Sequence, residues 1–306
     1  AAVLNTYAHS LSGSRDENSF DPMVRLQFRA NDSLAFHASF TEGSKAGGFD
    51  IRSNSAPGTV TVTGAPPGAF EFEDEEAENF ELGLKYNTDR SQINLTVFKT
   101  EYSNLQTSIF DGVLGFFVEN ASTAELEGAE MDARFLLSDG LEMYVSGAYI
   151  DFTYTDFKRS QCGYAETPVN GYCDRTGSTT PYLPETTASF GFNYETNISD
   201  GMGLDMNVNA DYSSSYFLST ALDGLHKESG YTKLGAQMGL SGGDGAWRVS
   251  VIGDNLTDER VMVAGVGLPL GRTFVRLASG GALDGTAFYS FYQRPRNITL
   301  KLDYNF

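Results

Sequence analysis

Apolar and polar residues alternate with a period of two along most of this 306-residue chain. In the clearest segment, 204–212, apolar residues alternate with residues that are all Asp or Asn. The end of the chain repeats the pattern, where Leu300 and Leu302 flank Lys301. Successive side chains of a β-strand point to opposite faces, so each such segment predicts a strand with one apolar and one polar face.

Two classes of all-β protein contain strands of this kind. In a soluble sandwich the apolar face packs against a second sheet, whereas in a membrane barrel it meets lipid and the polar face lines a water-filled lumen. Only 41% of the residues are hydrophobic, and the polar faces are rich in charge, which favours the barrel. A soluble all-β binding domain is the alternative, and it predicts a chain that stays monomeric without detergent.

No run of about 18 apolar residues occurs in the sequence, so we expect no transmembrane helix. No charged and then apolar leader precedes Ala1, so we expect no signal peptide in this sequence. Aromatic residues make up 13% of the chain, and many lie near predicted strand ends. Interfacial aromatic girdles of barrels explain this placement, and ordinary strand propensity is the alternative.

Short polar joints alternate with long connections. The joints lie near 30–33, 87–90, 138–140, 197–203 and 242–245, and the connections near 46–76, 106–117, 158–184, 215–229 and 261–292. Tight periplasmic turns and long extracellular loops are typical of outer-membrane barrels. We therefore expect an all-β, antiparallel transmembrane β-barrel that forms a single domain over residues 1–306. Its strands number about twelve: 3–11, 23–30, 34–45, 78–87, 91–106, 118–137, 141–157, 186–197, 203–215, 230–241, 246–260 and 293–306.

Five segments resemble motifs of TonB-dependent outer-membrane receptors, in the same order along the chain. They are FTEGSKAGGF at 40–49, EEAENFELGLK at 75–85, NASTAELEGAE at 120–130, DNLTDE at 254–259, and the Arg-Pro-Arg at 294–296 that precedes a terminal strand ending in Phe306. The resemblance thus extends over residues 40–306.

The resemblance implies a receptor of the bacterial outer membrane that imports a ferric siderophore or a similar bulky nutrient. Such receptors have barrels of about 22 strands, an N-terminal plug and a TonB-contacting segment, and nothing in this chain resembles the last two. The chain therefore looks like the C-terminal half of a larger barrel without its plug. Expected partners are outer-membrane lipid, lipopolysaccharide and a small-molecule substrate, with the plug and TonB reached only through the missing N-terminal part.

A passive outer-membrane pore or an adhesin-type small barrel is the alternative function. Two open sheet edges in lipid would leave backbone groups unpaired, so the chain has to close, pair or aggregate. One hypothesis is closure of strand 3–11 onto strand 293–306 as a self-contained pore.

Candidate functional residues fall into two groups. The polar residues expected to face the lumen, and to contact a plug or the passing solute, are Arg25, Arg29, Glu81, Lys85, Glu130, Asp132, Arg134, Asp205 and Asp211. The loop residues expected to contact the substrate are Phe110, Phe116, Phe117, Tyr164, Tyr172, Tyr216 and Phe217.

The two cysteines, Cys162 and Cys173, both lie in the long connection 158–184. In an oxidising exterior they should form a disulfide, which contributes about 3 kcal/mol in the chain-entropy model. A metal or redox site is the rival, disfavoured because no histidine is near and the C-x-x-C spacing is missing.

Several functions are not expected. The net charge of −19 and the pI near 4.4 argue against nucleic-acid binding. The three histidines have no neighbouring nucleophile-and-acid set, so we expect no enzyme and no cofactor. The acidic run at 71–78 could bind calcium, but it lacks the spacing of a calcium loop, and a solvated charge run is favoured over a metal site.

Overall fold

The main element of the structure, a computed structural model, is an antiparallel sheet of eleven strands. The structure describes residues 12–50, 70–110, 116–163, 166–167, 169, 172–243, 245–267 and 288–305. In order across the sheet the strands are β1 (Met23–Arg29), β2 (Leu34–Lys45), β5 (Glu75–Asn87), β6 (Ser91–Phe110), β7 (Phe116–Ser138), β8 (Leu141–Asp156), β9 (Thr186–Ser199), β10 (Met202–Ser213), β13 (Tyr231–Gly242), β14 (Trp247–Asp254) and β17 (Asn297–Tyr304).

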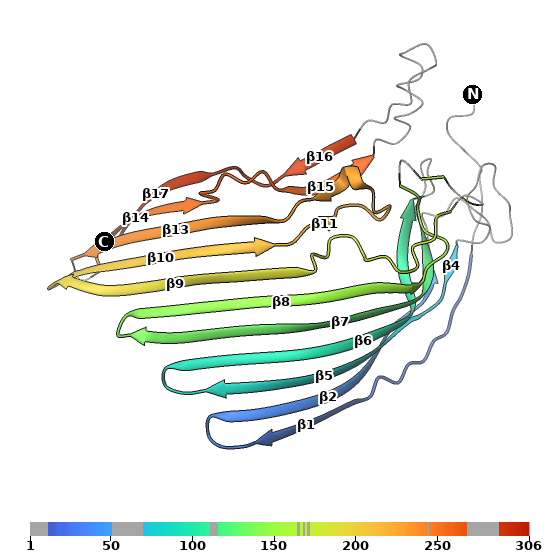
Figure 1. The fold of residues 1–306 in the computed structure, drawn as a ribbon, viewed down its shortest axis with the longest axis horizontal. Coiled ribbons are helices and arrows are strands. Elements are labelled where there is room, and N and C mark those ends of the chain that lie inside the picture. Colours follow the sequence, from blue (N-terminus) through green and yellow to red (C-terminus); the bar gives the residue numbers. More distant parts are fainter. Residues whose placement is uncertain are drawn as a thin grey trace, which may run out of the picture.

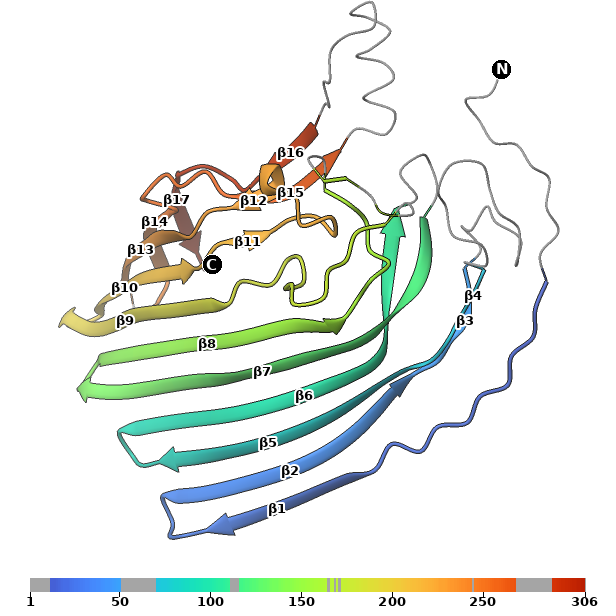
Figure 2. The same cartoon turned by 45° about the vertical axis from the view of Figure 1, so that its right-hand side comes forward.

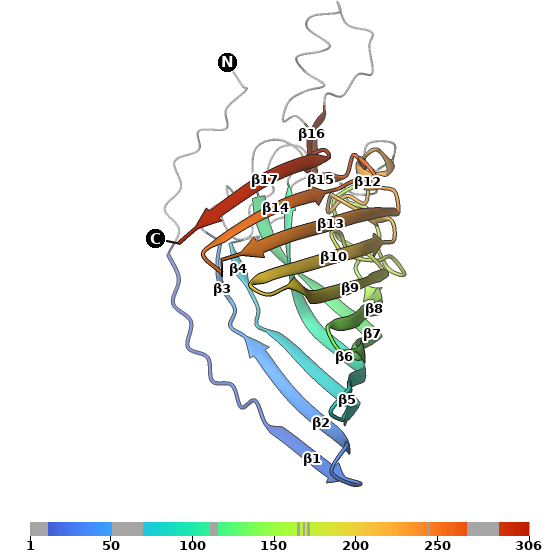
Figure 3. The ribbon, with the colours of Figure 1, turned by 90° about the vertical axis from the view of Figure 1, so that its left-hand side faces the viewer.

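Short turns lie at one end of this sheet and long connections at the other. Figure 1 shows the turns β1–β2, β5–β6, β7–β8, β9–β10 and β13–β14 together at the left. The sequence predicts this alternation of short and long joints. Figure 3 shows the sheet curving as an arc from β1 to β17, which are the two ends of the strand order.

Local chemistry explains why the turns are tight. Between β1 and β2, the side-chain oxygen of Asn31 accepts hydrogen bonds from the backbone N–H groups of Ser33 and Leu34, both at 2.9 Å. Such a bond within the turn fixes the reversal of the chain. Between β7 and β8, Gly140 adopts a φ of 79°, a left-handed conformation that glycine reaches without a steric cost.

The pairing register divides the side chains of the sheet into two faces, because directly opposed residues share a face. Leu82 on β5 opposes Ala38 on β2 and Val97 on β6, and we call their side the apolar face and the other side the polar face. Large side chains on the apolar face are exposed, for example 70% for Leu26 and 73% for Leu300. No second layer of described residues covers this face, as one would in a soluble sandwich.

Three small hairpins lie in the long connections, outside the strands that the sequence predicts. They pair β3 (Gly48–Phe49) with β4 (Glu71–Phe72), β11 (Tyr216–Phe217) with β12 (Lys227–Glu228), and β15 (Met262–Gly267) with β16 (Phe288–Tyr292). The connection between β11 and β12 also contains the short 3-10 helix η1 (Gly224–His226). Among the described residues no helix is long and apolar enough to cross a membrane.

Strand limits differ from the expected ones mainly toward the long connections. The expected connection 106–117 is wrong in part, because β6 and β7 stay paired as far as Phe110 and Phe116. Strand β14 ends at Asp254 rather than at 260, because Asn255 turns the chain with a φ of 49°. The expected strand 3–11, its closure onto the last strand, and Phe306 lie outside the described residues.

A compact apolar cluster lies where β6, β7 and β8 extend toward the long connections. Ile109, Ala124, Phe152, Tyr154 and Phe157 are buried together there. Partly buried side chains of the β8–β9 connection pack against them. A small hydrophobic core therefore lies at the ends of these long strands, where it anchors the β8–β9 connection to the sheet.

Candidate functional site

All the charged residues expected to face a lumen lie together on the polar face. They are Arg25, Arg29, Glu81, Lys85, Glu130, Asp132, Arg134, Asp205 and Asp211. The charge-bearing side of each amphipathic strand is therefore continuous across the sheet.

Polar groups on this face are partly bonded to one another, either between adjacent strands or over a strand that lies between them. Arg248 Nη2 donates to Asp205 Oδ2 at 2.6 Å, and His37 Nε2 lies 2.9 Å from Glu81 Oε1. The ring of His37, only 8% exposed, lies over Gly83, the residue directly opposite on β5. These interactions keep the polar side chains close to the surface of the sheet, so that they do not project away from it.

An open cavity of about 710 Å3 lies on the polar face, and the sheet forms its floor. Two neighbouring rows of directly opposed residues make up this floor across β7, β8, β9, β10 and β13. One row is Asp132, Ser146, Ser189, Asp211 and Lys233, and the next is Glu130, Ala148, Thr187, Ser213 and Tyr231.

The long connections supply the other wall of this cavity. Tyr182 and Pro184 come from the β8–β9 connection, Tyr216 from β11 and Val263 from β15. Figure 2 shows these connections gathered at the same end of the sheet. Burial raises the pKa of Tyr216 to about 12, with contributions from Tyr231 and Glu228, so its phenol is neutral at pH 7 and able to donate a hydrogen bond.

Hydrogen bonds tie the connections to one another; we call 157–185, 214–230 and 255–267 the loop cluster. Tyr182 N donates to Phe217 O at 2.7 Å, and Met262 N donates to Glu228 Oε2 at 2.5 Å. Residues of three different connections are thus joined by hydrogen bonds. The wall of the cavity is therefore one hydrogen-bonded unit rather than three separate loops.

Arg175 is the most connected side chain of the loop cluster. It is 7% exposed, donates to both carboxylate oxygens of Glu166 at 2.7 and 2.5 Å, and donates to Ala221 O at 2.5 Å. The Arg175 guanidinium lowers the pKa of Glu166, with help from the N–H of Gly163. Glu166 is therefore ionised at neutral pH and holds the guanidinium in place.

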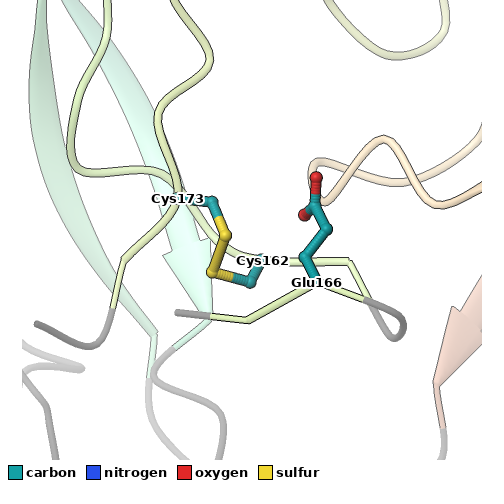
Figure 4. A group of neighbouring side chains, drawn as sticks. All are labelled: Cys162, Glu166 and Cys173. Carbon is teal, nitrogen blue, oxygen red and sulfur yellow. A yellow bond between two sulfur atoms is a disulfide. The ribbon is translucent and has the colours of Figure 1, made fainter. Parts of the chain in front are cut away.

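A disulfide joins Cys162 and Cys173 next to this ion pair, with their Cα atoms 5.0 Å apart. Figure 4 shows Glu166 beside the two sulfur atoms, and the potential ligand atoms of the three residues lie within 4.8 Å of one another. In this form they make a poor metal site, because the sulfur atoms are bonded to each other and the carboxylate accepts from Arg175.

A cation of the chain, Arg15, lies beside the first part of the acidic run at 71–78. Arg15 forms ion pairs with Glu71 at 3.2 Å and Glu73 at 2.6 Å, and it also contacts Glu17 and Asp74. Hydrogen bonds to Arg15 lower the pKa of Glu73. The arrangement brings part of the run together with a guanidinium of the same chain.

The loop residues expected to contact substrate are scattered. Phe110, Phe116 and Phe117 belong to β6 and β7 and their side chains, like Tyr164 as a whole, lie outside the described part of the chain. Tyr172 packs against the apolar cluster. Phe217 has the Lys227 ammonium 5.0 Å from its ring centre. Of the three whose side chains the structure describes, Tyr216 lines the cavity.

Sequence reasoning named Glu130, Asp132, Asp211 and Tyr216 and missed the other residues of the cavity, among them Tyr182, Tyr231, Lys233 and Val263. Tyr231 and Lys233 belong to the polar rows of a predicted strand, so the alternation pattern could have indicated them. Tyr182 and Val263 carry no local signal, because they reach the cavity through the folding of the connections.

Long antiparallel strands, an exposed apolar face and a charged opposite face are features of the strands of outer-membrane β-barrels. A family model described as TonB dependent receptor-like, beta-barrel, matches residues 3–256. The chain therefore belongs to the TonB-dependent receptor family, in agreement with the five motifs. Barrels of this family lie in the bacterial outer membrane, and the family consists of transporters rather than enzymes.

Solved receptors share the fold. The ferric yersiniabactin uptake receptor FyuA from Yersinia pestis is 18% identical, with a TM-score of 0.66 over 92% of this chain and 36% of that one. The ferric preacinetobactin receptor BauA from Acinetobacter baumannii is 19% identical, with a TM-score of 0.61 over 94% and 36%. The copper transporter OprC is 15% identical, with a TM-score of 0.62 over 93% and 39%. The chain thus spans a little over a third of the length of these receptors.

Proposed function

We propose that the chain is the C-terminal half of the barrel of a TonB-dependent receptor that imports a ferric siderophore or a similar bulky metal chelate. The single observation that carries this proposal is the cavity on the polar face, about 710 Å3 in volume, in a chain of this family. Solved receptors of the same fold are named for ferric chelates or copper, which supports the choice of cargo.

In this proposal the polar face lines the lumen and contacts a plug domain, with TonB supplying energy through that plug. The exposed apolar face contacts the hydrocarbon and lipopolysaccharide of the outer membrane. The open sheet edges support assignment to part of a barrel, because β1 and β17 each have one strand partner among the described residues and unpaired edges are costly in lipid. The remaining strands of a larger barrel would pair them.

The test is uptake by cells that carry the complete receptor as their sole route for ferric chelates. We expect growth under iron limitation and accumulation of radioiron, both lost when TonB is deleted or the membrane is de-energised. Uptake that persists without TonB would instead support a passive pore, and surface attachment without uptake would support an adhesin.

A further inference from the structure

The cavity floor has an unbalanced charge. Its charged side chains are Glu130, Asp132, Asp211 and Lys233, so three carboxylates face one ammonium. No described arginine or lysine forms an ion pair with any of the three carboxylates. Within the described part of the chain, the three carboxylates therefore keep their negative charge without an ion-pair partner.

The carboxylates are held in place by neutral groups. Asp211 accepts hydrogen bonds from Ser189 Oγ at 2.7 Å and from Asn209 Nδ2 at 2.6 Å, and Asp132 accepts one from Asn94 Nδ2 at 3.2 Å. These neighbours orient the carboxylates but leave their charge in place. Each carboxylate oxygen has more than one acceptor position, so capacity for further donors is left over.

The single cation of the floor is also engaged. Lys233 Nζ donates to Gln293 Oε1 at 2.8 Å and lies 5.7 Å from the ring centre of Tyr231. Both partners are neutral, and Lys233 and Tyr231 lie on β13, the last strand of the cavity floor. An anionic ligand would find one ammonium at that edge and carboxylates over the rest of the floor.

The wall adds neutral aromatic surface. Tyr182, Tyr216 and Tyr231 line the cavity from the connections and from β13. Their rings offer apolar contact, and phenols supply hydrogen bonds without charge. Such a surface accepts a ligand with hydroxamate, amide or hydroxyl groups and gives no compensation for extra negative charge.

We propose that this cavity selects neutral or cationic chelates that carry hydrogen-bond donors, of the hydroxamate class, and rejects polyanionic chelates such as ferric tris-catecholates. The inference rests on the proposed function, because it assigns the substrate class of the same cavity. In this proposal Asp132 and Asp211 determine which chelates bind. They lie in one row of the floor, three strands apart.

A matched ligand series tests the proposal on the complete receptor purified in detergent. The probes are the ferric complex of a linear trihydroxamate with a free terminal amine, its N-acetylated form and its N-succinylated form. These share one metal core and differ at one end as cation, neutral group and anion. Binding is measured by quenching of intrinsic tyrosine fluorescence at low and moderate salt.

We expect affinity to fall from amine to acetyl to succinyl form, by about tenfold across the series at low salt and by less at higher salt, because like charges repel and salt screens them. In the variant Asp132→Asn/Asp211→Asn the ranking should collapse to within about twofold, since the Coulomb term is removed. Asp303→Asn, which also lies on the polar face but outside the cavity, should leave the ranking unchanged.

An equal or reversed ranking, a ranking that survives in the double variant, or no binding of any of the three probes would overturn the assignment. The proposed uptake function fails by a different result. It fails if cells show no TonB-dependent accumulation of radioiron from any chelate, whatever the order of affinities measured on the purified receptor.

Discussion

At the scale of single residues, Arg175 shows how a charge can be buried in an exposed part of the molecule. A buried guanidinium is tolerable only when most of its donors are used. Arg175 uses Glu166 and the carbonyl oxygen of Ala221, which belong to different connections. The disulfide does not reach Ala221, so Arg175 adds a charged link between the two connections to the backbone hydrogen bond from Tyr182 to Phe217.

We predict that Arg175→Met loosens the loop cluster without unfolding the sheet. Hydrogen bonds to a charged group contribute about 1.5–3 kcal/mol, so amide exchange at Cys173 and Leu222 should accelerate about 10- to 100-fold. Hydrogen exchange with mass spectrometry on the complete receptor measures it. Lys158→Met is the control, because Lys158 is exposed and pairs with Asp156 within the same segment. Equal acceleration in both variants would contradict the prediction.

A second prediction concerns pH and His226. The imidazole is 3% exposed, and burial lowers its pKa, opposed by Asp223. The folded form thus binds the proton less readily than the unfolded form, so the stability that neutral His226 contributes is present above about pH 6.5 and is lost as the pH falls through the folded pKa. The loop cluster should therefore loosen on acidification.

The measurement is the exchange of the Leu218 amide, which donates to the carbonyl of His226 at 2.7 Å. After correction for intrinsic rates, protection should fall in the unmodified receptor as the pH is lowered below about 6.5 and through the lowered pKa of His226. The variant His226→Gln should lack this step. A step of the same size in that variant would assign the effect to other groups.

At the scale of strands, glycines on the polar face allow neighbouring side chains to lie flat. The ring of His37 occupies the place of a Cβ at Gly83, and the Asp205 carboxylate occupies it at Gly239. In each case the two residues are directly opposed in the register. The side chains opposite these glycines therefore lie close to the sheet. They take up little of the space in which, under the proposed function, a plug or a solute would lie.

We predict that Gly83→Ala displaces His37 from Glu81 and destabilises the barrel by about 1–3 kcal/mol, the usual cost of overpacking. Guanidinium unfolding of the complete receptor in detergent measures it. Adding His37→Ala should recover most of the loss, since the clash disappears. Gly43→Ala is the control, because Gly43 lies on the adjacent strand β2 and nothing is near its missing Cβ. Failure of the double variant to recover would locate the strain elsewhere.

The strands were predictable from sequence because most of them alternate apolar and polar residues and end at a turn with its own chemistry. Segments 34–45 and 141–156 illustrate this, since their observed limits lie within a residue of the expected ones. The two-residue strands β11 and β12 are too short to show a period. Their formation depends on partners distant in the chain, such as Met262 bonded to Glu228, and so does the cavity wall.

At the scale of the whole molecule, the open arc is the feature that most constrains the assembled state. Strands β1 and β17 present backbone groups without a second strand partner in the described sheet. In lipid each unpaired group costs several kcal/mol. The chain expressed alone should therefore aggregate, whereas the complete receptor should run as a heat-modifiable band on electrophoresis. A heat-modifiable, soluble form of the chain alone would instead favour closure into its own pore.

The apolar face of the sheet is exposed and the polar face lies on its other side. Two adjacent residues of β17 test whether lipid covers the apolar face. Leu300 is on the apolar face, opposite Val251, and Thr299 is on the polar face, opposite Ile252. If the apolar face meets lipid, Leu300→Arg should destabilise the complete receptor by about 2–4 kcal/mol near the bilayer midplane. Thr299→Arg should cost less than about 1 kcal/mol, because water or polar groups face it.

The measurement is the denaturant midpoint of the two variants folded into lipid vesicles. A soluble sheet would also resist a charge at Leu300, so the comparison is repeated in vesicles of shorter acyl chains. A thinner bilayer brings Leu300 closer to the interface, where the cost of arginine falls. A cost that does not change with bilayer thickness would show that protein rather than lipid contacts the apolar face.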